Sequence, residues 1–444
     1  MTPPVPDLEH ADRRQLTRRF LALALPLALS NLTVPLTGMV DMAMLGHLGR
    51  VEPLAGMGLA TALFNVVYWS LVFLVFGTAA AAGDAFGRGD RDEVFVTLYR
   101  SAAVGLILGV AILLIAPALR DTGLAVLAGT DAVKESARDY FNGRIVAAPA
   151  VLVNFAIVGW LSGVGRTRTV LGLDVASNGA NVVLDYLFIF SMGWEGYGAG
   201  LATALSQYLM LALGLAVVAR ERPPVAGMVA RSLEWEGLRR LLLLQRDLFL
   251  RLCGLVVAYS SFTHASAAIG TTTLAANTVL LKLLETIAIA FDGFSIAMAS
   301  MTAQLAGAGA VAATRRLLEG AFAVLFVFGL AVTAALAAGG ERVLALLTVH
   351  GDVVDAAAAY QPWLSALLVG VVATYVFDGL MLGLQRGNVL RNAVLGALVV
   401  YVPLAWFGME TASNTLLWSA LVAFMTARVA IMAVAARSYL GAWS

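Results

Sequence analysis

Charged residues are scarce in this sequence. Of its 444 residues only 13% are charged, while 60% are hydrophobic. A water-soluble domain has a charged fraction of about 25%, because its surface must be covered by polar groups. The composition therefore excludes an ordinary soluble protein and predicts a polytopic membrane protein.

Cysteine and histidine are also scarce. The single cysteine, Cys253, excludes an intramolecular disulfide and a cysteine-based metal cluster. The four histidines are His10, His47, His264 and His350. They have neither metal-ligand spacing nor a carboxylate-rich motif beside them, and a net charge of +1 provides no basic field for nucleic acid. We therefore expect no enzyme activity, no cofactor and no nucleic-acid partner.

Long apolar runs are what the sequence does contain. A transmembrane helix needs roughly 20 apolar residues, and runs of this kind, bounded by glycine, proline and charge clusters, number about twelve. They begin near residues 20, 59, 95, 140, 169, 196, 240, 276, 317, 358, 389 and 412. The sequence thus predicts an all-α membrane protein with about twelve transmembrane helices.

Most of the 29 lysines and arginines fall on alternate connections between these runs. Residues 1–19 carry four arginines and no cleavage site follows the first run, so we expect a cytoplasmic tail instead of a signal peptide. The same side is expected to hold the cluster from Arg220 to Arg251, and Arg428, whereas Arg144 is expected on the other side. The positive-inside rule then predicts both termini in the cytoplasm, with the protein in the inner (plasma) membrane of a prokaryote.

A polar stretch divides the predicted spans six and six. Residues 220–239 include Pro223-Pro224 and show little apolar periodicity, which indicates a cytoplasmic linker. The linker separates an N-lobe, residues 20–219, from a C-lobe, residues 240–437, and residues 438–444 form a second cytoplasmic tail.

The two lobes resemble each other in sequence. One constant shift along the chain places Gly87 on Gly307 and also Gly163 on Gly383, without a gap. We interpret this as an internal repeat of two pseudo-symmetric six-helix lobes. Repeats with an even number of spans are parallel, a layout found among transporters.

Asp41 lies in the apolar stretch from Phe20 to Leu48. A carboxylate there costs roughly 2.5–3.5 kcal/mol on insertion scales, so it needs a partner or a function. The distance from Arg19 to Asp41 is roughly 33 Å of helix at about 1.5 Å per residue, which places Asp41 in the outer half of span 1. The same estimate, made from Arg168, places Asp185 in the outer half of span 5.

Span 5 also carries a polar stripe. Asp174, Asn178, Asn181 and Asp185 are spaced four, three and four residues apart, which puts them on one helical face. Such a face must contact protein or a water-filled cavity. Asp174 and Asn178 suit interhelical hydrogen bonding as well as function, whereas Asn181 and Asp185, together with Asp41, favour function.

The acidic pair belongs to one lobe. The shift that superposes the glycines pairs Asp41 with Ser261 and Asp185 with Ala405. This asymmetry favours a coupling-ion site in the N-lobe. Two neighbouring buried carboxyl groups favour proton binding, and Asn181 and Thr203 would add the neutral oxygens that a hard cation such as Na⁺ prefers.

The C-lobe has charges of its own. Lys282 and Glu285 are three residues apart in span 8 and are expected to neutralise each other. Asp292 and Asp378 each precede a glycine within a span, where either can cap a local break or line the cavity. These four residues are candidates for a secondary cation site.

Two prolines, Pro26 and Pro35, lie in span 1. They remove backbone hydrogen bonds and permit helix bending near Asp41, with a static kink as the alternative.

Three strings carry a family resemblance. They read PLTGMVDMAMLGHLG in span 1, NVVLDYLFIFSMGWEGYGAGLAT in spans 5 and 6, and FDGLMLGLQRGN in span 10. The chain resembles the multidrug and toxic compound extrusion (MATE) transporters, in particular their DinF-like branch. The resemblance implies twelve helices in two lobes and alternating access that exports cationic or amphipathic compounds in exchange for H⁺ or Na⁺. It also implies that the N-lobe cation site of this branch falls on Asp41, Asn181, Asp185 and Thr203.

The other branch of that family is similar in having a span 10 aspartate, which Asp378 matches, and pairs it with a glutamate in span 7. Span 7 here offers Ser261, Thr263 and His264 instead. The C-lobe therefore lacks the pair that a second cation site of this type needs.

Two alternatives use the same spans. A lipid-linked saccharide flippase of the same superfamily should have cationic residues in its cavity, whereas the in-membrane charges here are mostly acidic. A scaffold or receptor without transport leaves the lobe-specific carboxylates unexplained. We expect a monomeric secondary-active exporter in the lipid bilayer, with small cationic or amphipathic substrates.

Overall fold

The computed structural model describes residues 11–221, 227–232, 234–347 and 351–441. Within these ranges the chain is helical and contains no strand, which confirms the predicted all-α class. Parts of the predicted tails and linker lie outside the described residues, namely 1–10, 222–226, 233 and 442–444.

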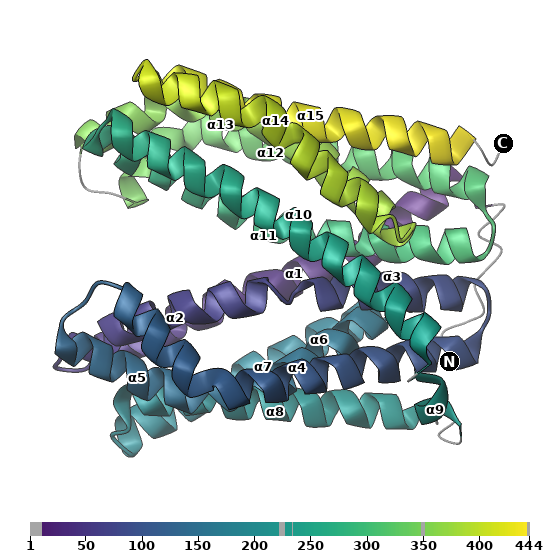
Figure 1. Ribbon diagram of the computed structural model, residues 1–444, viewed down its shortest axis with the longest axis horizontal. Coiled ribbons are helices and arrows are strands. Elements are labelled where there is room, and N and C mark those ends of the chain that lie inside the picture. Colours follow the sequence, from purple (N-terminus) through teal and green to yellow (C-terminus); the bar gives the residue numbers. More distant parts are fainter. Residues whose placement is uncertain (1–10, 222–226, 233, 348–350, 442–444) are drawn as a thin grey trace. The chain divides into compact units, whose positions relative to one another are not determined.

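The first half of the chain forms the elements up to the linker (Figure 1). They are α1 (Arg13–Gly46), α2 (Glu52–Trp69), α3 (Phe73–Gly87), α4 (Arg91–Val126), α5 (Asp131–Ile145), α6 (Ala148–Gly163), α7 (Thr167–Asp185), the π-helix η1 (Tyr186–Ser191), α8 (Glu195–Arg220) and α9 (Met228–Ser232).

The described residues of the second half form long helices. They are α10 (Trp235–Ile269), α11 (Thr271–Gly307), α12 (Val311–Leu347), α13 (Gly351–Gly383), α14 (Gly387–Glu410) and α15 (Asn414–Gly441).

Two compact units divide the chain, and the division falls within α1. The part of α1 up to Ala28 packs with the C-terminal unit, where Phe20 contacts Phe294 with ring centroids 6.1 Å apart. From Leu29 onward α1 belongs to the N-terminal unit. The helix runs through Pro26 and Pro35 without a break. The lobe boundaries expected from the sequence stay a prediction.

In the N-terminal unit α6 packs against α3 and α4, and α5 packs against α2 and α8. The α5 and α6 helices meet at a bend of 52°, just before Pro149. The buried aromatic side chains of Phe64, Tyr140 and Phe141 form the core beside α2 and α5. Helix α8 packs in turn against α7, which carries the polar stripe.

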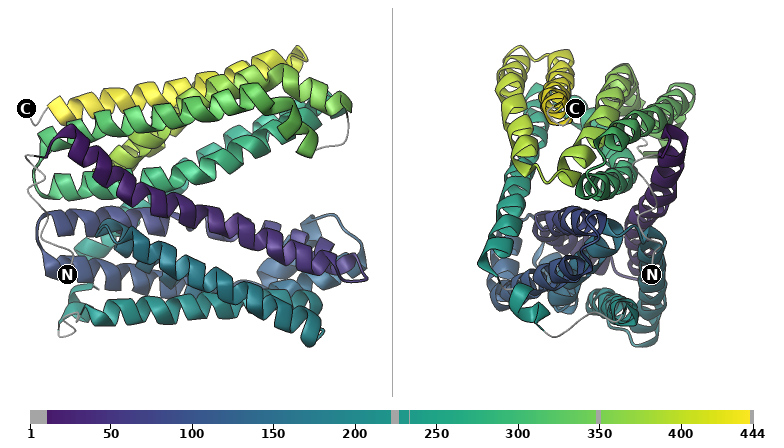
Figure 2. Two further views of the ribbon diagram at one scale, coloured as in Figure 1. Left: turned by 180° about the vertical axis from the view of Figure 1, so that it is seen from behind. Right: turned by 90° about the vertical axis from the view of Figure 1, so that its right-hand side faces the viewer.

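In the C-terminal unit α13 packs against α11, α12 and α15, and α14 lies alongside α15 (Figure 2). The core of this unit contains the fully buried side chains of Phe262, Tyr401, Trp418 and Phe424. The Trp418 indole donates to the Asn277 side-chain oxygen at 2.9 Å, so the polar atom of this buried ring is paired within the apolar core.

The internal repeat is confirmed by the helix ends. The ends of α3 and α6 at Gly87 and Gly163 recur at the ends of α11 and α13, Gly307 and Gly383, with the same separation along the chain. The close crossings recur too: a Cβ on Gly163 would lie 2.5 Å from the carbonyl oxygen of Ala79, and one on Gly383 would lie 2.5 Å from that of Ala299. Each unit thus brings two backbones into contact through a glycine.

Nine segments of the described chain are long and apolar enough to cross a membrane, or ten if the bent pair α5 and α6 is one span. The protein is therefore a multi-pass membrane protein. Helices α7 and α10 fall outside this set: α7 carries the polar stripe, and α10 carries Arg246, Asp247 and Arg251. The predicted number of twelve spans is not confirmed.

The glycine crossing gives a stability prediction. In Gly383→Ala the new methyl group would overlap the Ala299 carbonyl and the Thr302 side chain, and overpacking of this kind costs about 1–3 kcal/mol. We expect a lower midpoint of thermal unfolding for the purified protein. Gly172→Ala is the matched control, since a Cβ there meets no atom within 4 Å. Equal midpoints for the two variants would contradict the crossing.

Candidate coupling-ion site

The structure brings together the two carboxylates that the sequence pairs by depth. Asp41 lies in α1 and Asp185 is the last residue of α7. Both side chains are buried, with 5% and 0% exposure, and their carboxyl groups lie within hydrogen-bonding reach of each other. Asn181, one turn before Asp185, is buried as well.

Most side-chain polar atoms of Asp41, Asn181 and Asp185 have no hydrogen-bond partner among the described residues. No group in the described part of the chain donates to either Asp185 oxygen or to Asp41 Oδ1, and both polar atoms of the Asn181 amide lack a partner there. Buried polar atoms are nearly always hydrogen-bonded, so such a concentration of unpaired ones is unusual. Two ionised carboxylates also repel each other at this separation. A proton or a monovalent cation between them would remove both costs.

The polar stripe of α7 divides into two halves. Near the start of the helix Asp174 accepts a hydrogen bond from Ser30 of α1, and the Asn178 side-chain nitrogen donates to Thr33 of α1 at 2.7 Å. These two stripe residues join α7 to α1, which is the role that polar side chains commonly have between membrane helices. Asn181, by contrast, has no such partner among the described residues.

A change in helix type follows Asp185 directly. The six residues of η1 form a π-helix before α8 begins. Short π-helical segments are rare and often occur at functional sites, because they shift side chains out of the regular helical register. The sequence pattern gave no sign of this segment, since its apolar residues fit a continued α-helix equally well.

A guanidinium lies near the acidic pair. Arg144 of α5 is within electrostatic range of Asp41, donates to the Tyr140 hydroxyl at 3.0 Å and lies over the Phe64 ring at 4.7 Å from its centroid. An arginine stacked on an aromatic ring is attracted by the quadrupole of the ring, in addition to its attraction to nearby negative charges. Arg144 was expected on the outer side of the membrane, and its packing inside the N-terminal unit adds a positive charge to the site.

Thr203 lies on α8, which packs against α7. Its hydroxyl donates to the Ala199 carbonyl of its own helix at 3.1 Å, which leaves its lone pairs as acceptors. The two helices are joined by the Ser177 hydroxyl, which donates to the Ser206 carbonyl at 2.9 Å. The role expected for Thr203 as a cation ligand stays a prediction.

The equivalent positions in the C-terminal unit hold neutral side chains that hydrogen-bond each other and the backbone. In the internal repeat Ser261 corresponds to Asp41 and Tyr401 to Asn181, and the Ser261 hydroxyl lies 3.3 Å from that of Tyr401. Tyr401 is fully buried and donates to the Ala258 carbonyl at 2.8 Å. Neutral, hydrogen-bonded side chains therefore occupy the place that the N-terminal unit fills with unpaired polar groups.

The remaining C-lobe predictions have mixed outcomes. Lys282 and Glu285 form an ion pair of 2.9 Å, so they neutralise each other as expected. Asp292 and Asp378 do not cap breaks, because α11 and α13 run through them without interruption.

Two arginines were placed wrongly by the sequence. Arg251 and Arg428 were expected in cytoplasmic loops, but they lie within α10 and α15, and both form ion pairs with Asp378. The predicted spans that begin near residues 240 and 412 already included Arg251 and Arg428. Assigning the same two residues to loops was therefore inconsistent, and that inconsistency could have revealed their positions within helices.

The divided stripe predicts opposite effects on stability. Asn178→Ala removes the hydrogen bond to Thr33 and should lower the free energy of unfolding by about 0.5–2 kcal/mol. Asp185→Asn removes a buried charge without a protein donor, so its thermal midpoint should equal or exceed that of the unchanged protein. Thermal unfolding of the two purified variants in the same detergent measures this. A large loss of stability in Asp185→Asn would mean that Asp185 is a structural residue.

Comparisons with known proteins agree with this architecture. The MatE family model matches residues 26–187 and 249–407. DNA damage-inducible protein F of Escherichia coli strain K12 is 32% identical over 413 residues, which cover 91% of this chain and 89% of that protein. A probable multidrug resistance protein NorM of Bradyrhizobium diazoefficiens is 29% identical and covers 87% and 85% of the two chains.

A solved structure has the same fold over the whole chain. It is described as an outward-facing conformation of a multidrug resistance MATE family transporter of the MOP superfamily. It superposes with a TM-score of 0.86 at 21% identity and covers 100% of this chain and 99% of its own. The resemblance seen in the sequence is thereby confirmed, and with most of its length matched by the family model the chain belongs to the MatE family of transporters, with DinF among its relatives.

Proposed function

We propose that the protein is a secondary-active exporter that exchanges small cationic or amphipathic compounds for H⁺ or Na⁺. A relative described as a probable multidrug resistance protein supports export of small compounds, and the acidic pair of the N-terminal unit favours cationic ones. We further propose that it works as a monomer in the inner membrane of a prokaryote, with both termini in the cytoplasm.

The observation that carries the proposal is the unpaired acidic group of the N-terminal unit. Asp41, Asn181 and Asp185 are buried together, and five of their side-chain atoms have no hydrogen-bond partner among the described residues. Burying such atoms permanently would cost several kcal/mol with nothing gained in packing. A site that is filled and emptied in each cycle accounts for that cost.

The charges of the group set its exchange chemistry. Asp41 and Asp185 carry two negative charges when both are ionised, and Arg144 nearby contributes one positive charge. Uptake of one proton or one Na⁺ therefore brings the group to neutrality. A cationic substrate gains the same attraction in the N-terminal unit, so substrate and coupling ion compete for the two carboxylates.

Competition of this kind links the two fluxes. Binding of H⁺ or Na⁺ from outside neutralises the carboxylates and expels the cationic substrate. Inside, release of the ion restores the charge and attracts the next substrate. A ligand shifts a conformational equilibrium only through its different affinity for the two states, and a carboxylate pair that differs in hydration between states supplies that difference.

The flippase alternative gains no support from the buried arginines. Arg251 and Arg428 are the cationic side chains that a phosphate-bearing substrate would need in the C-terminal unit, but both are engaged with Asp378. Arg144 is stacked on Phe64 beside an acidic pair.

Asp41→Asn tests the proposed function. The substitution keeps the size of the side chain but removes the ionisable group, so active efflux of a cationic dye from cells lacking other pumps should fall to background. Asp185→Asn should be nearly as damaging. Lys282→Met is the matched control, because the Lys282–Glu285 pair is exposed and its two members neutralise each other, and it should keep most of the efflux. Full efflux by Asp41→Asn, at equal protein amounts in the membrane, would refute the mechanism.

A further inference from the structure

The C-terminal unit contains a second buried charge cluster, which the N-lobe mechanism does not use. Asp378 of α13 has a side chain only 4% exposed and accepts from two guanidinium groups through the same oxygen, Oδ2. Arg251 of α10 pairs with it directly, and Arg428 of α15 lies 3.3 Å away. Three helices thus meet at one carboxylate.

The surroundings of Asp378 exclude solvent and balance its charge. The Arg428 side chain is 4% exposed and lies over the Phe424 ring at 5.7 Å, and its Nη1 is 3.4 Å from the sulfur of Met425. Asp292 of α11 lies within electrostatic range of Arg251 and Asp378. With Asp292 ionised, two arginines and two aspartates sum to zero charge, so the cluster needs no bound ion to be neutral.

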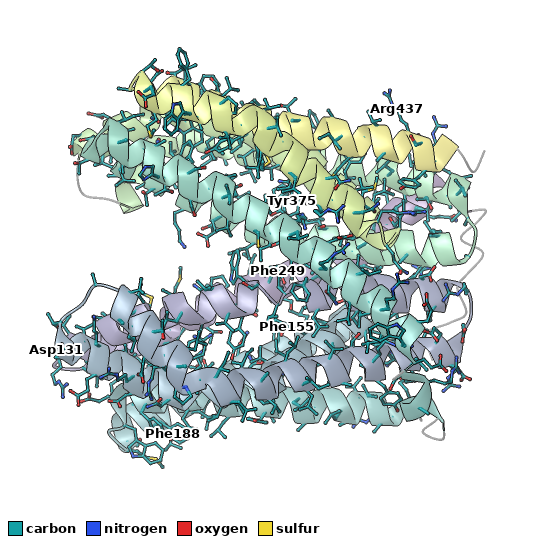
Figure 3. All side chains as sticks on the ribbon, in the orientation of Figure 1. Asp131, Phe155, Phe188, Phe249, Tyr375 and Arg437 are labelled. Carbon is teal, nitrogen blue, oxygen red and sulfur yellow. The ribbon has the colours of Figure 1, made fainter. Side chains whose placement is uncertain are left out.

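The other titratable groups that face the cluster are tyrosines. Tyr375 of α13, marked in Figure 3, lies within hydrogen-bonding reach of Asp292. Tyr259 of α10 lies within electrostatic range of Arg428 and Tyr375. Neither tyrosine competes with a guanidinium for Asp378, because a neutral phenol contributes far less to the local potential than a full charge does.

We propose that Arg251 and Arg428 act as tethered counter-ions that keep Asp378 ionised throughout the transport cycle, so that Asp378 exchanges neither H⁺ nor Na⁺. A guanidinium that is part of the chain stays beside the carboxylate, whereas a bound ion can dissociate into the solvent. Arginine keeps its charge under all physiological conditions. The proposal goes beyond the N-lobe mechanism, because it assigns positioning roles to two arginines and a fixed charge to Asp378.

The contrast between the two units supports the assignment. In the N-terminal unit one arginine faces two aspartates that lie within reach of each other. In the C-terminal unit two arginines hold one aspartate, and the second aspartate balances the extra charge. The first arrangement leaves a charge for an exchangeable cation, whereas the second leaves none.

Infrared spectroscopy of the full-length protein in lipid nanodiscs tests the proposal. A protonated carboxyl group has a carbonyl stretch that an ionised one lacks, and the spectra would be compared as the pH is stepped from about 5 to about 9. Asp292 is a second carboxyl group within electrostatic range of Asp378, so Asp292→Asn is the common background for this comparison. Spectra of Asp292→Asn with and without Asp378→Asn should show the same carboxyl bands at every pH. A band that titrates in Asp292→Asn and is lost when Asp378→Asn is added would overturn the proposal.

The arginines are tested by removing their charge. In the double variant Arg251→Met/Arg428→Met a new carboxyl band should appear, and adding Asp378→Asn should remove it. The double variant Arg251→Lys/Arg428→Lys keeps both charges and should show no new band. A folded methionine variant without the new band would overturn the role of the arginines. If that variant does not fold, the comparison with and without Asp378→Asn in the Asp292→Asn background still decides.

The spectra are independent of transport. If Asp41→Asn kept full efflux, the proposed function would fail while the state of Asp378 could still be read from its carbonyl band. Conversely, a titrating Asp378 would leave the N-lobe mechanism in place and add a second exchangeable group to it.

Discussion

The lack of water in the bilayer core restricts the hydrogen bonding of every polar atom that lies within the membrane. A polar group between the headgroup layers must find its partner within the chain, because lipid offers none. Most of the buried polar side chains meet that requirement: Asn178 bonds Thr33, Trp418 bonds Asn277, and Asp378 is held by two arginines. Asp41, Asn181 and Asp185 differ in degree: five of their side-chain atoms, buried close together, lack such partners among the described residues, and the only bond within reach is between the two carboxyl groups, whereas the Asp378 cluster leaves only Asp378 Oδ1 and the Nε atoms of its two arginines unpaired. The proposed exchange of ions rests on that exception.

The internal repeat makes the exception easier to interpret. Both units share helix ends and glycine crossings at one constant separation along the chain, so the same backbone framework has received different charges. Where the N-terminal unit has Asp41 and Asn181, the C-terminal unit has Ser261 and Tyr401, which bond each other and the backbone. A framework requirement would affect both units alike. We therefore attribute the difference between the two units to the role proposed for the N-terminal unit in ion exchange.

The sequence predicted most of the fold, because hydrophobicity, glycine spacing and arginine placement act over long stretches. The all-α class and the repeat followed from such patterns, and the family followed from the resemblance of three sequence strings. The pairing of Asp41 with Asp185 came from depth along a helix, which depends only on residue number. Side-chain partners were harder. The sequence left both a structural and a functional role open for Asp174 and Asn178, because the spacing of the stripe does not show that these two residues bond α1 while Asn181 does not. Arg251 and Arg428 were assigned to cytoplasmic loops and Arg144 to the outer side, because the positive-inside rule considers charge alone. The positions of these arginines depend on carboxylates and aromatic rings far along the chain.

The central claim is that substrate and coupling ion compete for Asp41 and Asp185. Equilibrium binding of a fluorescent cationic dye to the purified protein, measured at several pH values and Na⁺ concentrations, tests it most directly. For the wild-type protein the dye affinity should fall as H⁺ rises, as Na⁺ rises, or with both, and the response identifies the ion. In Asp41→Asn/Asp185→Asn the affinity should be lower and should no longer respond to either ion. An undiminished dependence in that double variant would contradict the account.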